Sequence, residues 1–269
     1  MLSGRIRTNQ GEIKTTGRVK YLPDDNGIYK PYEITVCDRL MFMPDGWELS
    51  DKEDSDKLPK GVASNPEENR RKSFARAKNN LFDLLLCTPS MNCFVTLTIN
   101  PDVIDNRADY KEIVKRLSVW LDNRVRRKGL LYVLVPEYHK DGESVHFHGL
   151  MNFEALELTR ATNGKVGSKH YGEPLFDDKG REVYNIVDYK LGFSTVIPID
   201  GENGREACAK YCYKYIIKSN GQKVGGRYYL SGGALGRPRY EYVNADIDDY
   251  EGEAFTIGPT GIRMKKVKL

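Results

Sequence analysis

The clearest periodic segment of the chain is Tyr110–Lys128, where apolar residues recur every three or four positions. This spacing places them along one side of a helix, and Gly129 follows where such a helix would end. The apolar stripe comprises Ile113, Val114, Leu117, Trp120, Leu121 and Val125. The sequence therefore predicts an amphipathic helix over residues 110–128.

Two further helices are predicted, one before this segment and one after it. The first begins at Pro66, with Ser64 or Asn65 as its N-cap and two glutamates in its first turn, a composition typical of helix starts. The second spans Arg205–Ser219, where tyrosine, cysteine and isoleucine residues follow helical spacing.

Short apolar runs rich in β-branched residues predict the strands. We expect them at Ile28–Val36, Arg39–Met43, Cys93–Ile99, Leu130–Val135 and Val145–Phe153, with one or two more within Tyr184–Ile199. This order of elements favours an α+β fold, with a central antiparallel sheet and helices packed on it. We expect a β-rich extension ending in an acidic loop over 1–65, a main domain over 66–240, and an acidic then basic tail over 241–269.

Composition excludes several classes of protein. The 269 residues carry a net charge of +4, and this length suits one large domain or two small ones. No stretch approaches the ~18 apolar residues that a membrane span needs, and the first residues lack the apolar core of a secretory signal. The five cysteines form no C-x-x-C pair, so we expect a cytoplasmic protein with no disulfide framework and no zinc ribbon.

The small net charge is the sum of segments of opposite sign. Residues 107–128 and 205–240 are basic, whereas residues 45–68 and 241–254 are acidic. A single charged run is usually only a solvated surface. Two basic runs that flank the candidate chemistry favour a basic face able to bind a polyanion.

Three of the four histidines lie within ten residues, and two form a His-x-His pair. Alternate residues of a strand point to the same side, so His146 and His148 project together. A turn at Asp141-Gly142 would place Glu137 of the preceding strand beside them. Two imidazoles and a carboxylate can hold a divalent ion and leave positions open for water or phosphate. We expect Mn²⁺ or Mg²⁺ as this metal.

Other interpretations of these residues stay open. His139, Asp141 and Glu143 are rival third ligands, although a loop would fix them less firmly. The two histidines could also lie on a solvated strand face. His170 lies in a polar stretch, and we assign it no role.

The helix predicted over 205–219 carries two overlapping Tyr-x-x-Lys units. Tyr211 and Tyr215 share a helix face, and Lys214 and Lys218 follow them by three residues each. A phenol with a pKa of ~10 is a poor nucleophile unless its anion is stabilised, and a nearby ammonium group stabilises that anion and also neutralises phosphate. The helix predicts a tyrosine nucleophile; the alternative is an amphipathic helix with an aromatic core side and a basic rim.

Three motifs in this order resemble the HUH endonucleases: Phe94-Val-Thr-Leu-Thr98, His146-Phe-His148 and Tyr211-x-x-Lys214-Tyr215-x-x-Lys218. Within that superfamily the chain is similar to the two-tyrosine rolling-circle replication initiators of single-stranded DNA phages and related plasmids. The resemblance covers roughly residues 94–230 and implies an RRM-like or palm-like sheet. Conjugative relaxases carry the tyrosine before the histidines, and the HUH transposases of small insertion sequences are shorter.

The resemblance implies metal-assisted transesterification of single-stranded DNA at an origin. One tyrosine would attack the scissile phosphate, giving a 5′-phosphotyrosine and a 3′-hydroxyl primer, and the other would later release a circle. No nucleotide cofactor is expected. The chain contains no G-x-x-x-x-G-K-[ST] motif, so a helicase and a polymerase of a bacterial host are the expected partners.

Basic and aromatic side chains in the two basic runs would contact the DNA. We expect these contacts from Arg124, Arg126, Arg127, Lys128, Arg227, Tyr228, Arg237 and Arg239. Three alternative functions stay open: a transposase-like or relaxase-like nickase, a metal-dependent phosphohydrolase that uses water, and a non-catalytic RRM-like nucleic-acid binder.

Overall fold

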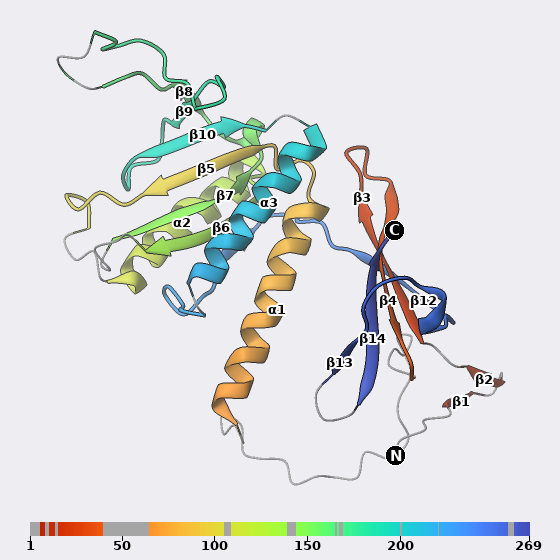
Figure 1. The fold of residues 1–269 in the computed structure, drawn as a ribbon. Coiled ribbons are helices and arrows are strands. Elements are labelled where there is room, and N and C mark those ends of the chain that lie inside the picture. Colours follow the sequence, from red (N-terminus) through yellow and green to blue (C-terminus); the bar gives the residue numbers. More distant parts are fainter. Residues whose placement is uncertain are drawn as a thin grey trace. The chain divides into compact units, whose positions relative to one another are not determined.

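The computed structural model of the chain shows two compact units. It describes residues 16–39, 65–104, 109–138, 144–164, 166, 169–199, 201–219, 221–257 and 261–269, with two short strands near the N-terminus, β1 (Ile6–Thr8) and β2 (Gly11–Ile13). Unit 1 combines Met1–Ser64 with Pro238–Leu269, and unit 2 is Asn65–Arg237. The described part is α+β, with two large antiparallel sheets and three helices (Figure 1), which confirms the predicted fold class.

Unit 2 is built on a seven-stranded sheet with the order β11-β6-β7-β5-β10-β9-β8. The three central strands are β6 (Tyr132–Tyr138), β7 (Val145–Met151) and β5 (Cys93–Thr98). The others are β11 (Leu230–Gly232), β10 (Ser194–Pro198), β9 (Tyr184–Ile186) and β8 (Leu158–Arg160), and η1 (Phe153–Ala155) is a short helical turn. The histidine-bearing strand β7 therefore has an antiparallel neighbour on each side.

Helix α2 (Tyr110–Lys128) packs on one face of this sheet. Its Ile113, Leu117 and Leu121 join a buried core with Leu97 of β5 and Phe147 of β7. Since alternate strand residues point to opposite sides, the residues between these core positions face the other side of the sheet.

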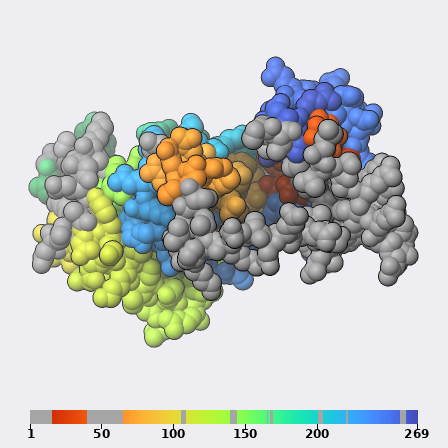
Figure 2. All heavy atoms as spheres, turned by 90° about the horizontal axis from the view of Figure 1, so that it is seen from below, coloured from red at the N-terminus to blue at the C-terminus, as the bar shows by residue number. Residues whose placement is uncertain are grey.

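Helices α1 (Pro66–Cys87) and α3 (Gly201–Lys218) pack against each other and against β6, on the sheet face opposite α2. In the space-filling view, the orange surface of α1 adjoins the light blue surface of the α3 segment (Figure 2). Helices thus cover both faces of the central strands.

The ends of the helices follow from local chemistry. The side chain of Asn65 caps α1 by accepting a hydrogen bond from the backbone N–H of Glu68, which supplies a partner to a helix-start donor. Gly129 ends α2 in the left-handed conformation, with a φ of 65°. These boundaries confirm the predicted ones, whereas α3 begins at Gly201, earlier than the predicted Arg205.

Unit 1 joins the two ends of the chain in one five-stranded antiparallel sheet, with the order β12-β3-β4-β14-β13. Its strands are β3 (Gly17–Pro23), β4 (Tyr29–Cys37), β12 (Arg239–Val243), β13 (Phe255–Ile257) and β14 (Ile262–Lys268), with the helical turn η2 (Ile247–Asp249). The segment expected as a tail therefore supplies three strands. Residues 40–43 of the strand expected at Arg39–Met43 lie outside the described residues.

No helix in the described ranges has the length and apolar character needed to cross a membrane.

Gly149 at the centre of β7 permits close packing of the sheet backbones. A Cβ atom at this position would overlap the backbone carbonyl oxygen of Val133 in β6. We expect Gly149→Ala to lower the free energy of unfolding by ~1–3 kcal/mol, because the strands must shift apart. Chemical denaturation measures this loss. Gly164→Ala is the control, since a Cβ there meets nothing within 4 Å; equal losses in both variants would contradict the steric argument.

Candidate active site

Strand β7 places the His-x-His pair between two neighbouring strands. In the register of the sheet, His148 lies opposite Thr96 of β5, and His146 lies opposite Glu137 of β6. The carboxylate Oε2 of Glu137 is 3.1 Å from Nε2 of His148. The predicted approach of Glu137 to the histidines is therefore confirmed. The rival ligands His139, Asp141 and Glu143 lie outside the described residues.

The imidazole of His148 is held at both ring nitrogens. Its Nδ1 is 3.0 Å from the hydroxyl oxygen of Thr96, on the side of the ring away from Glu137. Because a hydroxyl both donates and accepts hydrogen bonds, Thr96 can partner either tautomer. His148 is only 8% exposed, so its orientation is fixed by these contacts and by packing.

Glu137 and His148 fit two adjacent ligands of one divalent ion. Donors bound at ~2.1 Å in octahedral geometry are ~3 Å apart, close to the observed separation of 3.1 Å. The ring of His146 is 6.1 Å from that of His148, between centroids. Within the described residues, however, no three His, Cys, Asp or Glu side chains are grouped closely enough to hold an ion. Two of the three expected ligands converge, and the metal itself stays a prediction.

Helix α3 brings both tyrosines to this histidine. The ring of Tyr215 stacks on His148 with a centroid separation of 4.4 Å and an interplanar angle of 6°. Its hydroxyl donates a hydrogen bond to the hydroxyl oxygen of Tyr211. Tyr215 is 6% exposed and Tyr211 is 46% exposed. Burial, together with the Tyr211 hydroxyl, raises the pKa of the Tyr215 phenol.

The two lysines of the Tyr-x-x-Lys units are placed differently from each other. The ammonium of Lys218 lies 3.4 Å from Oε1 of Glu137 and 5.0 Å from the centre of the Tyr215 ring. Lys214 is exposed on α3, one turn after Tyr211. Lys218 thus connects the helix to the histidine and carboxylate pair, whereas Lys214 faces solvent.

Two residues of β5 belong to the site although the sequence did not assign them to it. Thr96 contacts His148, and the ring of Phe94 is 5.5 Å from Tyr211 and 6.2 Å from His148, between centroids. Strand alternation predicts that both point to one side. Only the pairing of β5 with β7 decides that this side is the side of the histidines.

Most of the basic residues expected to contact DNA lie away from this site. Arg126, Arg127 and Lys128 are exposed at the end of α2, on the opposite face of the sheet. Arg227 and Arg237 are exposed in unit 2 beyond α3. Arg239 belongs to unit 1, where its guanidinium carbon is 3.9 Å from the centre of the Tyr29 ring.

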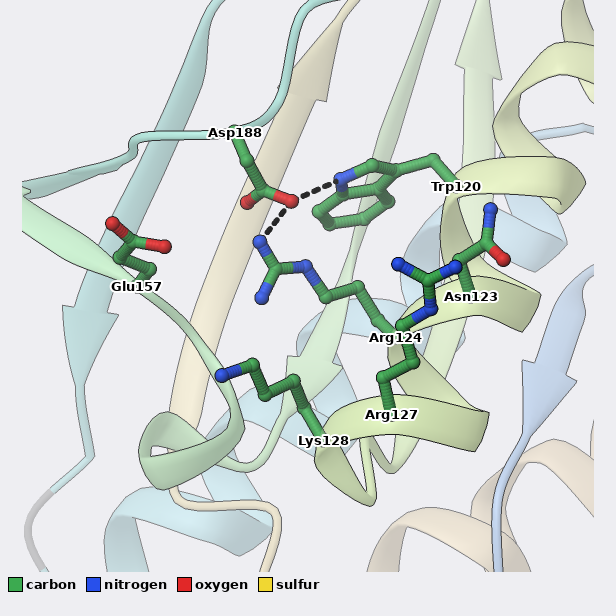
Figure 3. A pocket seen from close by; sticks show the side chains of 7 residues that line it. All are labelled: Trp120, Asn123, Arg124, Arg127, Lys128, Glu157 and Asp188. Carbon is green, nitrogen blue, oxygen red and sulfur yellow. Dashed lines mark hydrogen bonds and ion pairs between the residues drawn. The ribbon is translucent and has the colours of Figure 1, made fainter.

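Arg124 and Tyr228 differ from the expectation that they contact DNA. Arg124 is buried and forms an ion pair with Asp188, which also accepts a hydrogen bond from the Trp120 indole (Figure 3). These three side chains line a pocket of about 330 Å³ beside α2. Tyr228 is buried, with its ring 5.3 Å from that of Phe74. Both side chains are used in packing, which argues against direct DNA contact.

Residues 92–220 match a family model of replication-associated proteins of the ORF2 type. This range contains β5, β6, β7 and α3, and so includes every residue that converges on the site described above. It covers just under half of the chain and leaves out unit 1. Searches of curated proteins and of solved structures give no match.

The ion pair of Arg124 predicts a structural role. We expect Arg124→Ala to lower the free energy of unfolding by ~1–3 kcal/mol, because it leaves the Asp188 carboxylate without its charged partner. Arg127→Ala is the matched control on the same helix, exposed and expected to change stability by less than ~0.5 kcal/mol. Thermal or urea unfolding compares the two. A loss of DNA affinity in Arg124→Ala without a loss of stability would refute this assignment.

Proposed function

We propose that the chain is a replication initiator that nicks and rejoins single-stranded DNA at an origin, with a tyrosine as the nucleophile. The observation that carries this proposal is the exposed hydroxyl of Tyr211, hydrogen-bonded to Tyr215, whose ring stacks on His148. The match of this region to a family of replication-associated proteins supports the same role.

Tyr211 is the first nucleophile in this proposal. It is the more exposed of the two tyrosines, so a phosphodiester can reach its oxygen without a rearrangement of the core. The Tyr215 hydroxyl donates to that oxygen, and a hydrogen bond to the anionic form stabilises it. Phe94 packs against the ring of Tyr211 and restricts its position.

The reaction exchanges one phosphate ester for another. The Tyr211 oxygen forms a bond to phosphorus, the bond from phosphorus to the 3′-oxygen breaks, and the proton lost by the phenol ends on that 3′-oxygen. The products are a 5′-phosphotyrosine and a free 3′-hydroxyl. No nucleotide cofactor is required, because the covalent intermediate retains the ester bond. Tyr215 would serve in the second transfer, which releases the circle.

Glu137, His146 and His148 would hold a divalent ion, Mn²⁺ or Mg²⁺. When bound, such an ion supplies positive charge that neutralises the scissile phosphate. Thr96 would orient the His148 ring through Nδ1, as partners of metal-binding histidines usually do. Lys218 and the exposed Lys214 would bring further positive charge towards the DNA backbone.

The alternative of a non-catalytic RRM-like binder fits the geometry less well. An RRM binds RNA bases on an open sheet face, whereas helices cover both faces of the central strands of the seven-stranded sheet. A phosphohydrolase that uses water would share the metal ligands but would need neither tyrosine.

A covalent adduct distinguishes these functions. After incubation with single-stranded origin DNA and Mn²⁺, we expect a denaturant-resistant protein–DNA band on a gel. Tyr211→Phe should abolish the band, because the attacking oxygen is gone, whereas Tyr215→Phe should still form it and should lose the later release of circles. Cys212→Ser, a change at a buried position of the same helix, is the control. Cleavage by the double variant Tyr211→Phe/Tyr215→Phe would sink the tyrosine assignment and favour hydrolysis by water.

The metal ligands give a separate prediction. His148→Ala, or removal of divalent ions with EDTA, should reduce adduct formation by at least ~100-fold, the order of effect expected when a group that stabilises charge at the reacting phosphate is lost. Affinity for the same DNA should stay within a few-fold, because the backbone contacts come from other residues. Adduct formation at full rate in EDTA would show that no metal takes part. His170→Ala is the control, as His170 pairs with Glu173 at a different place.

A further inference from the structure

Charged and aromatic side chains form two rows across the five-stranded sheet of unit 1. Residues directly opposite each other in paired strands point to the same side of a sheet. Following the register through β12, β3, β4 and β14, the two rows are Tyr240–Lys20–Glu33–Lys268 and Tyr242–Arg18–Thr35–Lys266. We call the surface that these eight residues form the basic sheet face.

The other side of the same strands faces the core of unit 1. Val19, Ile34 and Val36 are buried there and pack with Ile247. Because the residues of the basic sheet face alternate with these core residues, they point away from the core. At the edge strand β12, Tyr240 is 39% exposed and Tyr242 is 36% exposed.

Four cationic side chains stand on this face, against one carboxylate. The ammonium of Lys266 is 3.8 Å from the carboxylate of Glu33, which offsets part of the charge. The guanidinium carbon of Arg18 is 4.6 Å from the centre of the Tyr240 ring, so a cation and an aromatic ring share one place. Neighbouring strands are ~4.8 Å apart, and the face therefore presents closely spaced positive charges with two rings at one edge.

We propose that the basic sheet face binds single-stranded DNA. Repeated phosphates match the rows of cations, and unpaired bases can stack on exposed tyrosine rings, the combination that proteins use to bind single strands without sequence preference. A duplex would satisfy the cations but would keep its bases away from the rings. This inference goes beyond the proposed transesterification, because unit 1 lies outside residues 92–220 and carries none of the site residues.

The experiment measures DNA affinity in the full chain without cleavage. The parent protein carries Tyr211→Phe/Tyr215→Phe, so that no covalent adduct forms, and fluorescence anisotropy follows a labelled oligothymidylate of about 20 nucleotides at several salt concentrations. Lys266→Gln/Lys268→Gln should reduce the slope of log affinity against log salt by ~1.4, since each phosphate contact contributes ~0.7 for single strands. Tyr240→Ala/Tyr242→Ala should weaken binding about fivefold or more per ring.

The matched control removes two positive charges from the other side of the same strand. Arg263 and Lys265 alternate with Lys266 and Lys268 along β14 and contact Asp38 and the Tyr250 carbonyl. Arg263→Gln/Lys265→Gln should therefore leave the salt slope unchanged. Equal losses in the two double variants, or parental affinity in Lys266→Gln/Lys268→Gln, would overturn the proposal.

A second measurement needs no folded variant of unit 1. The unmodified protein is photocrosslinked to a single strand containing 5-iododeoxyuridine, and the crosslinked peptides are identified by mass spectrometry. We expect crosslinks in the β12 peptide that contains Tyr240 and Tyr242, and their absence would overturn the assignment. Equal affinity for a duplex of the same length, unaffected by Tyr240→Ala/Tyr242→Ala, would overturn the preference for single strands. Neither result depends on the adduct assay, so the two proposals fail independently.

Discussion

The antiparallel pairing of β7 with β5 on one side and β6 on the other holds the candidate site together. This register sets His148 opposite Thr96 and places Glu137 within 3.1 Å of the imidazole. A slip by one residue would turn both histidines to the side of α2, because strand side chains alternate. Gly149 contributes to the same pairing, since its missing side chain lets the backbone of β6 approach.

Once the sheet is fixed, the packing of α3 completes the site. The stacking of Tyr215 on His148 and the contact of Lys218 with Glu137 fix the helix against both strands that carry the candidate ligands. The same packing gives the two tyrosines unequal roles, because Tyr215 becomes part of the interior and Tyr211 stays accessible. An alternating use of two equivalent tyrosines would therefore require Tyr215 to leave its place against His148.

The two units divide the proposed work. Unit 2 carries the candidate nucleophiles and ligands and contains the range that matches a replication-associated family. Unit 1 presents rows of cations and tyrosines on one sheet face and has no part in the candidate chemistry. A separate contact to the strand would let the protein hold DNA whether or not the phosphodiester is cleaved. The basic end of α2, by contrast, lies on the face of the seven-stranded sheet away from the site.

Local sequence determined the features that depend on neighbouring residues. The bounds of α2 follow from its apolar spacing and from Gly129, and the approach of Glu137 to the His-x-His pair follows from two consecutive strands that fold back on each other. The α+β class follows from the order of the elements.

Only the tertiary structure decided which distant segments meet. Thr96 reaches His148 across 52 residues, and β14 pairs with β4 although they lie at opposite ends of the chain. Arg124 looked like a surface cation until Asp188 of a distant segment paired with it. Periodicity tells which side of a strand or helix a residue occupies, but the partner on that side is chosen by the packing of the whole core, which local spacing does not encode.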